Sequence, residues 1–263
     1  MNILQTLLEA LESLTANKLR SMLTILGIVI GVAAVIAMIS LGRGLQDAVN
    51  GQFAGIGTTT LTILSMPDPS LHTYQPMTLG DVAALSDPTS VTGVSQVAAA
   101  IQGSGTAAYG SKTAAPSFYG VTSNYGTVNG LKVQEGRFLE EEDVLGQTSV
   151  VVIGSRTAEK LFERQRGIVG EVIRLDGQPY RVVGVLDAKG SVDMGLSAGD
   201  DAAIVPLTTA QARLIARGDR TQVDMVTVQL SNANEIDTAT ETIKQILRIR
   251  HRLPVGTDDS YIF

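Results

Sequence analysis

The sequence predicts an α+β protein in which one N-terminal transmembrane helix precedes an extracytoplasmic domain of two mixed α/β subdomains. Residues 22–41 form an apolar run of twenty residues without a charge. Beyond residue 43, short β-branched segments alternate with short helical segments, and Gly, Ser and Thr punctuate them. The chain contains no Cys, and an exterior part of about 220 residues can bury enough apolar surface to fold without disulfides.

The apolar run predicts a membrane span over residues 21–42. Twenty helical residues at about 1.5 Å each cover roughly the 30 Å of a hydrocarbon core. A cleaved secretory signal is the first alternative, but its apolar region is shorter, about 7 to 15 residues, and ends at a cleavage site of small residues. No such site follows Leu41. A helix buried in a soluble core is the second alternative.

The flanking charges predict the orientation of this span. Lys18 and Arg20 precede the run, whereas only Arg43 follows it closely. Because basic residues favour the cytoplasmic side, we expect the N-terminus in the cytoplasm, the helix in the inner membrane, and residues 43–263 outside. The chain carries a net charge of −6, which argues against nucleic acid as a partner, since phosphate binding needs concentrated positive charge.

Residues 1–20 predict an amphipathic helix on the cytoplasmic face of the bilayer. Apolar residues recur there at helical spacing on one side, which suits an interfacial helix. A continuous extension of the spanning helix into water is the alternative. Within the span, Gly27 and Gly31 form a G-x-x-x-G pair that would allow the backbone of another helix to approach closely. We expect these two glycines to form a helix-packing face.

The first exterior portion, about residues 58–135, reads as an inserted subdomain. After a helical continuation over 43–53, residues 58–64 alternate as a half-buried strand does. Thr78 and Asp81 have capping-box spacing and predict a short helix that ends near residues 87–88. Between residues 91 and 121 we expect two or three strands, although the alanines of 97–100 are poor strand formers. A short helix is expected over 123–128.

The second exterior portion, about residues 136–252, reads as an α+β subdomain with helices on one face of its sheet. The dipeptide Asp176-Gly177 suits a tight hairpin turn. Thr208 is expected to cap a helix that reaches about Arg217. The remaining expected elements are strands at 149–153, 170–175, 180–186, 204–206 and 223–230, and helices at 155–162 and 235–251.

Candidate chemistry in the exterior portions is sparse. Residues 150–156 pass from strand to glycine to helix, as a phosphate-binding turn does, but neither nucleotide-binding glycine signature follows. His72 lies in a Pro-rich loop, and His251 reads as the solvated end of a helix. The acidic cluster Glu140–Asp143 reads as hydrated surface carboxylates. Asp187, Asp193, Asp200 and Asp201 lie in a Gly-rich loop that reads as flexible rather than as an ordered calcium loop. We therefore predict no catalytic residue, no cofactor and no metal site.

An ordered series of segments resembles the MacB-type permeases of ABC transporters. Residues 17–36 are similar to the first transmembrane helix of that family. The resemblance continues, in order, through residues 135–138, 150–154 with the helix to Phe162, 169–170, 180–186, 204–210 and 250–252. It covers nearly the whole chain. The macrolide exporter and lipoprotein-extracting permeases share this design, so the resemblance indicates the family and not the substrate.

The resemblance implies a non-catalytic permease half of a homodimeric transporter. In such proteins a cytoplasmic ABC ATPase subunit drives movement of the exterior domain, which pushes substrate or engages an adaptor protein outside the membrane. The family also implies a stalk and three further spans, which are absent here, so we expect a truncated permease, with a split or degenerate member of the family as the alternative. The alternatives are a single-span binding or sensor protein and a tethered hydrolase, and the latter would require catalytic residues that the sequence does not offer.

Overall fold

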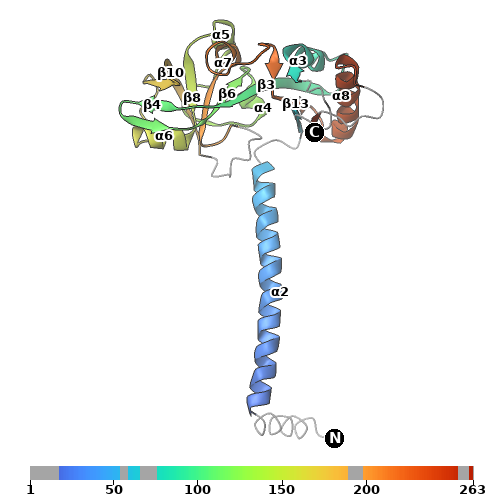
Figure 1. The fold of residues 1–263 in the computed structure, drawn as a ribbon. Helices are drawn as coiled ribbons and strands as arrows, with labels where there is room; N and C mark the ends of the chain where they lie inside the picture. The colour runs from blue at the N-terminus through green and yellow to red at the C-terminus, as the bar shows by residue number, and fades with distance from the viewer. Residues whose placement is uncertain (1–17, 54–58, 66–75, 189–197, 254–260, 263) are drawn as a thin grey trace. The chain divides into compact units, whose positions relative to one another are not determined.

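The computed structural model describes residues 18–53, 59–65, 76–188, 198–253 and 261–262 (Figure 1). The chain divides into two units, Met1–Gly51 and Gln52–Phe263, and each is described by itself. The amphipathic helix predicted over residues 1–20 falls almost entirely outside the described residues.

The first unit is helix α2, Lys18–Phe53, 36 residues long. At about 1.5 Å per residue it is longer than a hydrocarbon core is thick. Its segment Met22–Ser40 has a mean hydropathy of 2.8 and no buried residue, so its length and composition suit a membrane span. The predicted apolar helix over 21–42 and its continuation over 43–53 are therefore both helical.

Among its described residues, the second unit contains a sheet of twelve strands. Their order is β14-β1-β13-β3-β6-β11-β8-β10-β9-β4-β5, and β7 also pairs with β10. Strands β2 and β12 form a separate pair. The bounds are β1 Thr60–Ser65, β2 Met77–Thr78, β3 Val94–Ser104, β4 Ala107–Tyr109, β5 Lys112–Ala114, β6 Ser117–Val121, β7 Val133–Gly136, β8 Val150–Ile153, β9 Val172–Leu175, β10 Gln178–Leu186, β11 Ala202–Pro206, β12 Gln222–Val223, β13 Met225–Leu230 and β14 Tyr261–Ile262.

Helices pack on both faces of this sheet. They are α3 Leu79–Ser86, α4 Tyr125–Val128, α5 Glu141–Leu145, α6 Ser155–Phe162, α7 Leu207–Arg213 and α8 Ile236–Arg250, with a 3-10 turn at Ala233–Glu235. One core cluster contains side chains of α3, α6, α7 and α8, and a second contains those of α4. Figure 1 shows α3 and α8 beside β3 and β13 at one end of the sheet, with α6 and β4 at the other.

The sheet runs across the boundary predicted near residue 135. Strand β13 comes from the later portion of the chain, yet it lies between β1 and β3 of the earlier portion. Likewise β11 pairs in parallel with β6. Strands from both predicted portions therefore alternate within one sheet, and the boundary near residue 135 does not divide this sheet.

Residues 91–121 form four strands, β3 to β6, where two or three were predicted. The alanine-rich stretch lies in the middle of β3, and Ala98 and Ala100 share a core cluster with Tyr119 and Tyr125. Because two large rings occupy this part of the core, small side chains fit where larger strand formers would overfill it. Packing thus outweighs the low strand propensity of alanine.

Two local predictions about turns and caps are confirmed, and one is wrong. Asp176 and Gly177 have φ values of 46° and 83°, the positive pair that a type I′ hairpin turn requires. Thr78 and Asp81 form both hydrogen bonds of a capping box. Thr208 does not cap α7, because the helix already begins at Leu207 with Pro206 at its N-cap, and it ends at Arg213 and not near Arg217. The Thr208 hydroxyl instead donates to the carbonyl oxygen of Val144 in α5.

Candidate functional site around Asp81

Asp81 closes the first turn of α3. The backbone N–H and the hydroxyl of Thr78 each donate to Oδ2 of Asp81 at 2.8 Å. The backbone N–H of Asp81 donates in return to Thr78 Oγ1 at 3.4 Å. These bonds satisfy amide groups that would otherwise lack partners at a helix N-terminus.

The same carboxylate also binds the end of α8, far away in the sequence. Arg250 Nε donates to Asp81 Oδ1 at 2.6 Å, and His251 Nε2 lies 2.9 Å from Oδ2. The Asp81 side chain is only 2% exposed. A buried carboxylate is stable only when it is paired and hydrogen-bonded, and here partners from two helices meet that need.

The interpretation of His251 as a solvated helix end is wrong. Its side chain is 11% exposed and faces Asp81, and its ring meets the ring of Tyr261 edge-on, with centroids 5.6 Å apart. The sequence showed the basic run that contains His251, but it could not show a carboxylate 170 residues earlier. Two sequence signals fall on this site, the capping-box spacing of Thr78 and Asp81 and the family resemblance of the Arg250-His251-Arg252 segment, but neither indicates that the two segments meet.

The hydrogen bonds around Asp81 outweigh the effect of its burial. Burial alone would raise the pKa of this carboxyl group, whereas donation from Arg250, Thr78 and His251 lowers it, and the net pKa lies below the ordinary value. Asp81 is therefore ionised at neutral pH and attracts the cationic end of α8.

The Asp81 junction, which consists of Thr78, Asp81, Arg250 and His251, is connected to the paired strands β1 and β14. Strand β1 is the first strand after α2, and β14 is the last strand, and they pair antiparallel through Leu64 with Ile262 and Ser65 with Tyr261. Tyr261 is buried and contacts His251, which contacts Asp81. These contacts connect α3 and α8 to β14 and, through its pairing with β14, to β1.

We expect the stability contributed by Asp81 to depend on pH. Because its pKa is lowered on folding, this contribution is complete well above the unfolded value of about 3.9 and is lost as pH falls through the folded pKa. Denaturant titrations of the wild type and Asp81→Asn between pH 7 and pH 3 should give a difference in unfolding free energy that is constant near neutrality and shrinks at acid pH. A difference that grew toward low pH would contradict the assignment.

The acidic cluster Glu140–Asp143 is structural in part, contrary to its interpretation as a hydrated surface. Asp143 is buried, and Arg137 Nη1 donates to it at 2.6 Å. The Glu140 N–H and the Thr148 hydroxyl also donate to its two oxygens. Burial raises the pKa of Asp143, but these bonds outweigh it and lower the net value. Asp143 thus ties α5 to the segment that leads into β8.

The backbone N–H groups at the start of α6 already donate hydrogen bonds within the protein. The N–H groups of Arg156 and Thr157 donate to the carbonyl oxygen of Asp200 at 3.0 and 3.3 Å, so they are not free to hold a phosphate.

The aspartates predicted to lie in one loop differ in their surroundings. Asp201 pairs with Arg156 and Lys160, Asp200 is buried, and Asp187 is exposed. His72 and Asp193 lie outside the described residues. Within the described ranges, no three His, Asp or Glu side chains gather as metal ligands would.

The two glycines predicted as a packing face lie in the apolar part of α2. No heavy atom lies within 4 Å of the position that a Cβ would take at Gly27 or Gly31. The surface of the helix is therefore open at both residues, and their role in packing stays a prediction.

Comparison with known proteins shows which family this chain resembles. Residues 21–246 match the family model described as the MacB-like periplasmic core domain. The chain is 30% identical over 263 residues to the macrolide export ATP-binding/permease protein MacB of Bdellovibrio bacteriovorus, covering 97% of this chain and 39% of that protein. It is 29% identical to the uncharacterized ABC transporter permease YknZ of Bacillus subtilis, covering 99% and 64%. The chain therefore spans only part of these relatives.

Two solved structures resemble the exterior domain. The periplasmic region of MacB from Actinobacillus actinomycetemcomitans superposes with a TM-score of 0.64 at 22% identity, covering 80% of this chain and 90% of that one. The extracellular domain of the noncanonic ABC-type transporter YknZ from Gram-positive bacteria gives 0.60 at 28% identity, covering 77% and 97%. Because the family model matches most of the chain, from the apolar helix through most of α8, this protein belongs to the family of ABC transporter permeases with a MacB-like periplasmic core domain.

Proposed function

We propose that this chain is the first membrane span and the exterior domain of an ABC transporter permease that passes movement from a cytoplasmic ATPase to the outside. Movement of the exterior domain would then export or extract a substrate. The observation that carries the proposal is the junction around Asp81. It joins α3 to α8, and His251 contacts Tyr261 of β14, which pairs with β1, the first described strand after α2.

The proposal includes the rest of the transporter. The relatives are permeases of ABC transporters, and this chain covers 39% of one and 64% of another. We infer that the full permease has further spans, pairs with a second copy and binds an ATPase subunit, with an adaptor protein as a further partner outside.

The N-terminus is cytoplasmic in this arrangement, and α2 spans the inner membrane. Protease added to intact spheroplasts should cut the exterior domain and spare the first twenty residues.

A label on the exterior domain tests the coupling without knowledge of the substrate. The chain has no Cys, so a spin label can be placed at Ile249→Cys, an exposed position on α8. In the full-length permease with its ATPase, we expect the distance between the labels of the two copies to change when ATP hydrolysis is trapped with vanadate. An ATPase variant that cannot bind ATP serves as the control. An unchanged distance would overturn the coupling and favour a membrane-anchored binding or sensor protein.

Substitution of Gly31 tests the role of α2 in assembly. Gly31→Leu would fill the open surface of the helix at this position, and we expect the full-length permease to assemble poorly while its exterior domain melts at the wild-type temperature. Val29→Leu is the matched control, because two residues of helix place it on nearly the opposite side of α2. Size-exclusion chromatography in detergent measures the assembly. Normal dimers of Gly31→Leu would refute the packing role.

A further inference from the structure

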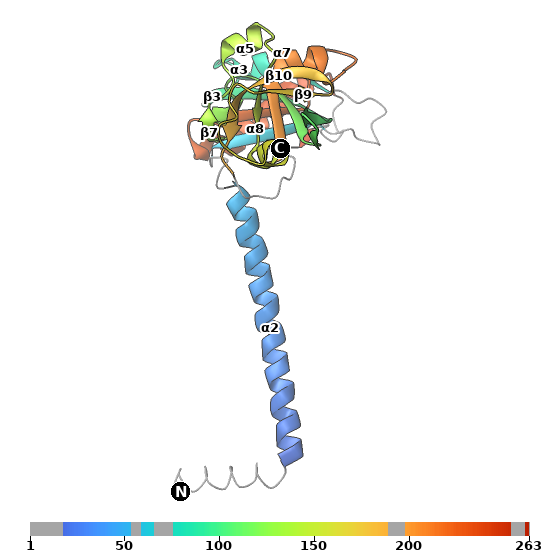
Figure 2. The ribbon, with the colours of Figure 1, turned by 90° about the vertical axis from the view of Figure 1, so that its left-hand side faces the viewer.

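The sheet exposes one of its faces where β9 pairs with β10, and Figure 2 views the exterior domain from this end of the sheet. Side chains alternate between the two faces of a strand. Ile173 and Tyr180 oppose each other on one face and belong to the core cluster that contains Leu161 of α6. On the other face Val172 opposes Arg181, and both are exposed. This second face is therefore accessible to a ligand.

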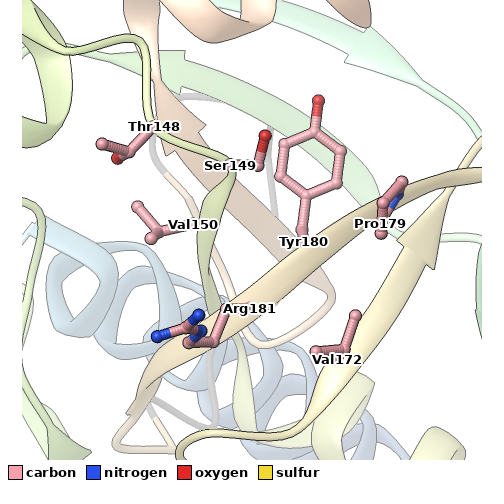
Figure 3. Close-up of a pocket in the computed structure, with 7 residues that line it drawn as sticks. All are labelled: Thr148, Ser149, Val150, Val172, Pro179, Tyr180 and Arg181. Carbon is pink, nitrogen blue, oxygen red and sulfur yellow. The ribbon is translucent and has the colours of Figure 1, made fainter.

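A hollow of about 430 Å³ lies between β8 and β10, and the residues that line it are labelled in Figure 3. Its volume falls within the range of small-molecule sites, about 300–1,000 Å³. Val150, Val172 and Pro179 supply apolar wall. Arg181 pairs across the sheet with Val150 on one side and with Val172 on the other, so a charged group borders the apolar wall.

The free polar groups of this hollow are hydrogen-bond donors. Within the part of the chain that the structure describes, the guanidinium of Arg181 forms no ion pair. The hydroxyl of Ser149 accepts a hydrogen bond from Nη1 of Arg213 at 2.6 Å, so its own proton is available to a further acceptor. Thr148 already donates to Asp143, and no carboxylate is among the described residues that line the hollow. Donors with a net positive charge favour an anion.

Tyr180 adds a buried hydroxyl group that lacks a partner. The residue is 1% exposed, and among the described residues nothing forms a hydrogen bond with its hydroxyl. Burial raises the pKa of Tyr180 and the charge of Arg213 opposes this rise, so the hydroxyl lies near the side chain that also binds Ser149. Figure 3 shows the hydroxyl groups of Ser149 and Tyr180 pointing the same way. A buried hydroxyl without a partner is unfavourable, and an acceptor atom placed between these two groups would remove that cost.

A second hollow beside Arg181 does not offer this set of donors. It has a volume of about 370 Å³ and is lined by Val169, Val182, Val183, two glycines, Arg137 and Arg181. The guanidinium of Arg137 is already paired with Asp143 at 2.6 Å. None of the described residues that line this hollow carries a hydroxyl group. The hollow between β8 and β10 is therefore the better anion site.

We propose that the hollow between β8 and β10 binds a small carboxylic acid with an apolar tail. Its carboxylate accepts hydrogen bonds from Arg181 and Ser149, and its tail lies against Val150, Val172 and Pro179. The two oxygens of a carboxylate match the planar guanidinium group. Its single charge also suits the one unpaired cation of the hollow better than a phosphate group, which carries about −1.5 to −2 at neutral pH. The site belongs to the exterior domain itself and does not depend on the movement proposed above.

Hexanoate tests the ligand class on the full-length permease in lipid nanodiscs, with empty nanodiscs as the blank. Saturation-transfer NMR measures the dissociation constant. We expect saturable binding of hexanoate and roughly tenfold weaker binding of hexanamide, which has the same tail without the charge. Hexyl phosphate should also bind more weakly than hexanoate. Absence of hexanoate binding, equal binding of hexanamide, or tighter binding of hexyl phosphate would overturn the proposal.

Substitutions at Val172 locate the binding on the permease. Val172→Glu places a carboxylate opposite Arg181, where it competes with the ligand, and it should weaken hexanoate binding roughly tenfold. Val172→Gln is the matched control, since it has almost the same size without the charge, and it should bind within about threefold of the wild type. A folding defect caused by a longer side chain would affect both variants alike, so equal affinities of the two would refute the site.

A second pair of variants removes the cation. Arg181→Gln should weaken hexanoate binding roughly tenfold. Arg174→Gln is the control, because Arg174 is exposed on the same face of β9 and lies outside the hollow, and its affinity should equal that of the wild type. Unchanged affinity of Arg181→Gln would show that hexanoate binds elsewhere. The distance change trapped with vanadate reports on the coupling alone, so its failure would leave this site standing.

Discussion

Replacement of Asp81 with alanine should destabilise the exterior domain by about 2–4 kcal/mol, from the loss of a helix cap and of charge-assisted hydrogen bonds. The variant removes the acceptor of Thr78, Arg250 and His251 together. Because the Arg250 side chain is 40% exposed, water can solvate it after the loss, and the cost stays below that of a fully buried unpaired charge. Thermal unfolding followed by circular dichroism should show a melting temperature lower by roughly 5–15 °C.

Asp87→Ala is the matched control for this variant. Asp87 follows α3 and accepts hydrogen bonds from Thr89, but it is exposed to solvent. We expect its removal to leave the melting temperature almost unchanged, because water replaces the lost acceptor. If Asp81→Ala and Asp87→Ala melted alike, the contacts of Asp81 with α8 would contribute nothing to stability, and the junction would not fasten the two helices.

Substitution of Gly136 with alanine should cost about 2–4 kcal/mol, through backbone strain and a close contact. Gly136 has φ of 79°, a region that residues with a Cβ rarely adopt. A Cβ there would also lie 2.1 Å from the carbonyl oxygen of Val183, which belongs to the β10 backbone and cannot turn aside. The variant should therefore disturb the pairing of β7 with β10.

Gly167→Ala separates the two causes. Gly167 has φ of 68°, but no heavy atom lies within 4 Å of the position of its Cβ, so only the conformational cost of about 1 kcal/mol remains. Unfolding free energies from denaturant titration of both variants measure the difference. Equal losses at the two positions would show that the close approach of β7 to β10 is absent.

Local patterns predicted the parts of the fold that depend on neighbours in sequence. The capping box at Thr78 and Asp81 and the turn at Asp176 and Gly177 each involve residues within one turn of chain, so their spacing alone determines the geometry. The helix over 155–162 was predicted with the bounds that α6 has. The length of the apolar run predicted a helix able to span a membrane, because span length follows directly from helical rise.

The sequence determined the α+β composition, the apolar helix, most elements and the local turns, whereas only the tertiary structure decided the strand order and the junction. The insertion of β13 between β1 and β3 depends on pairings across more than 120 residues, and Asp81 meets Arg250 at a separation of 169. Propensity and periodicity act over a few residues, so they fix local conformation. Which distant strand or cation completes a buried surface depends on packing and on the pairing of buried charge, and these exist only once the chain has folded.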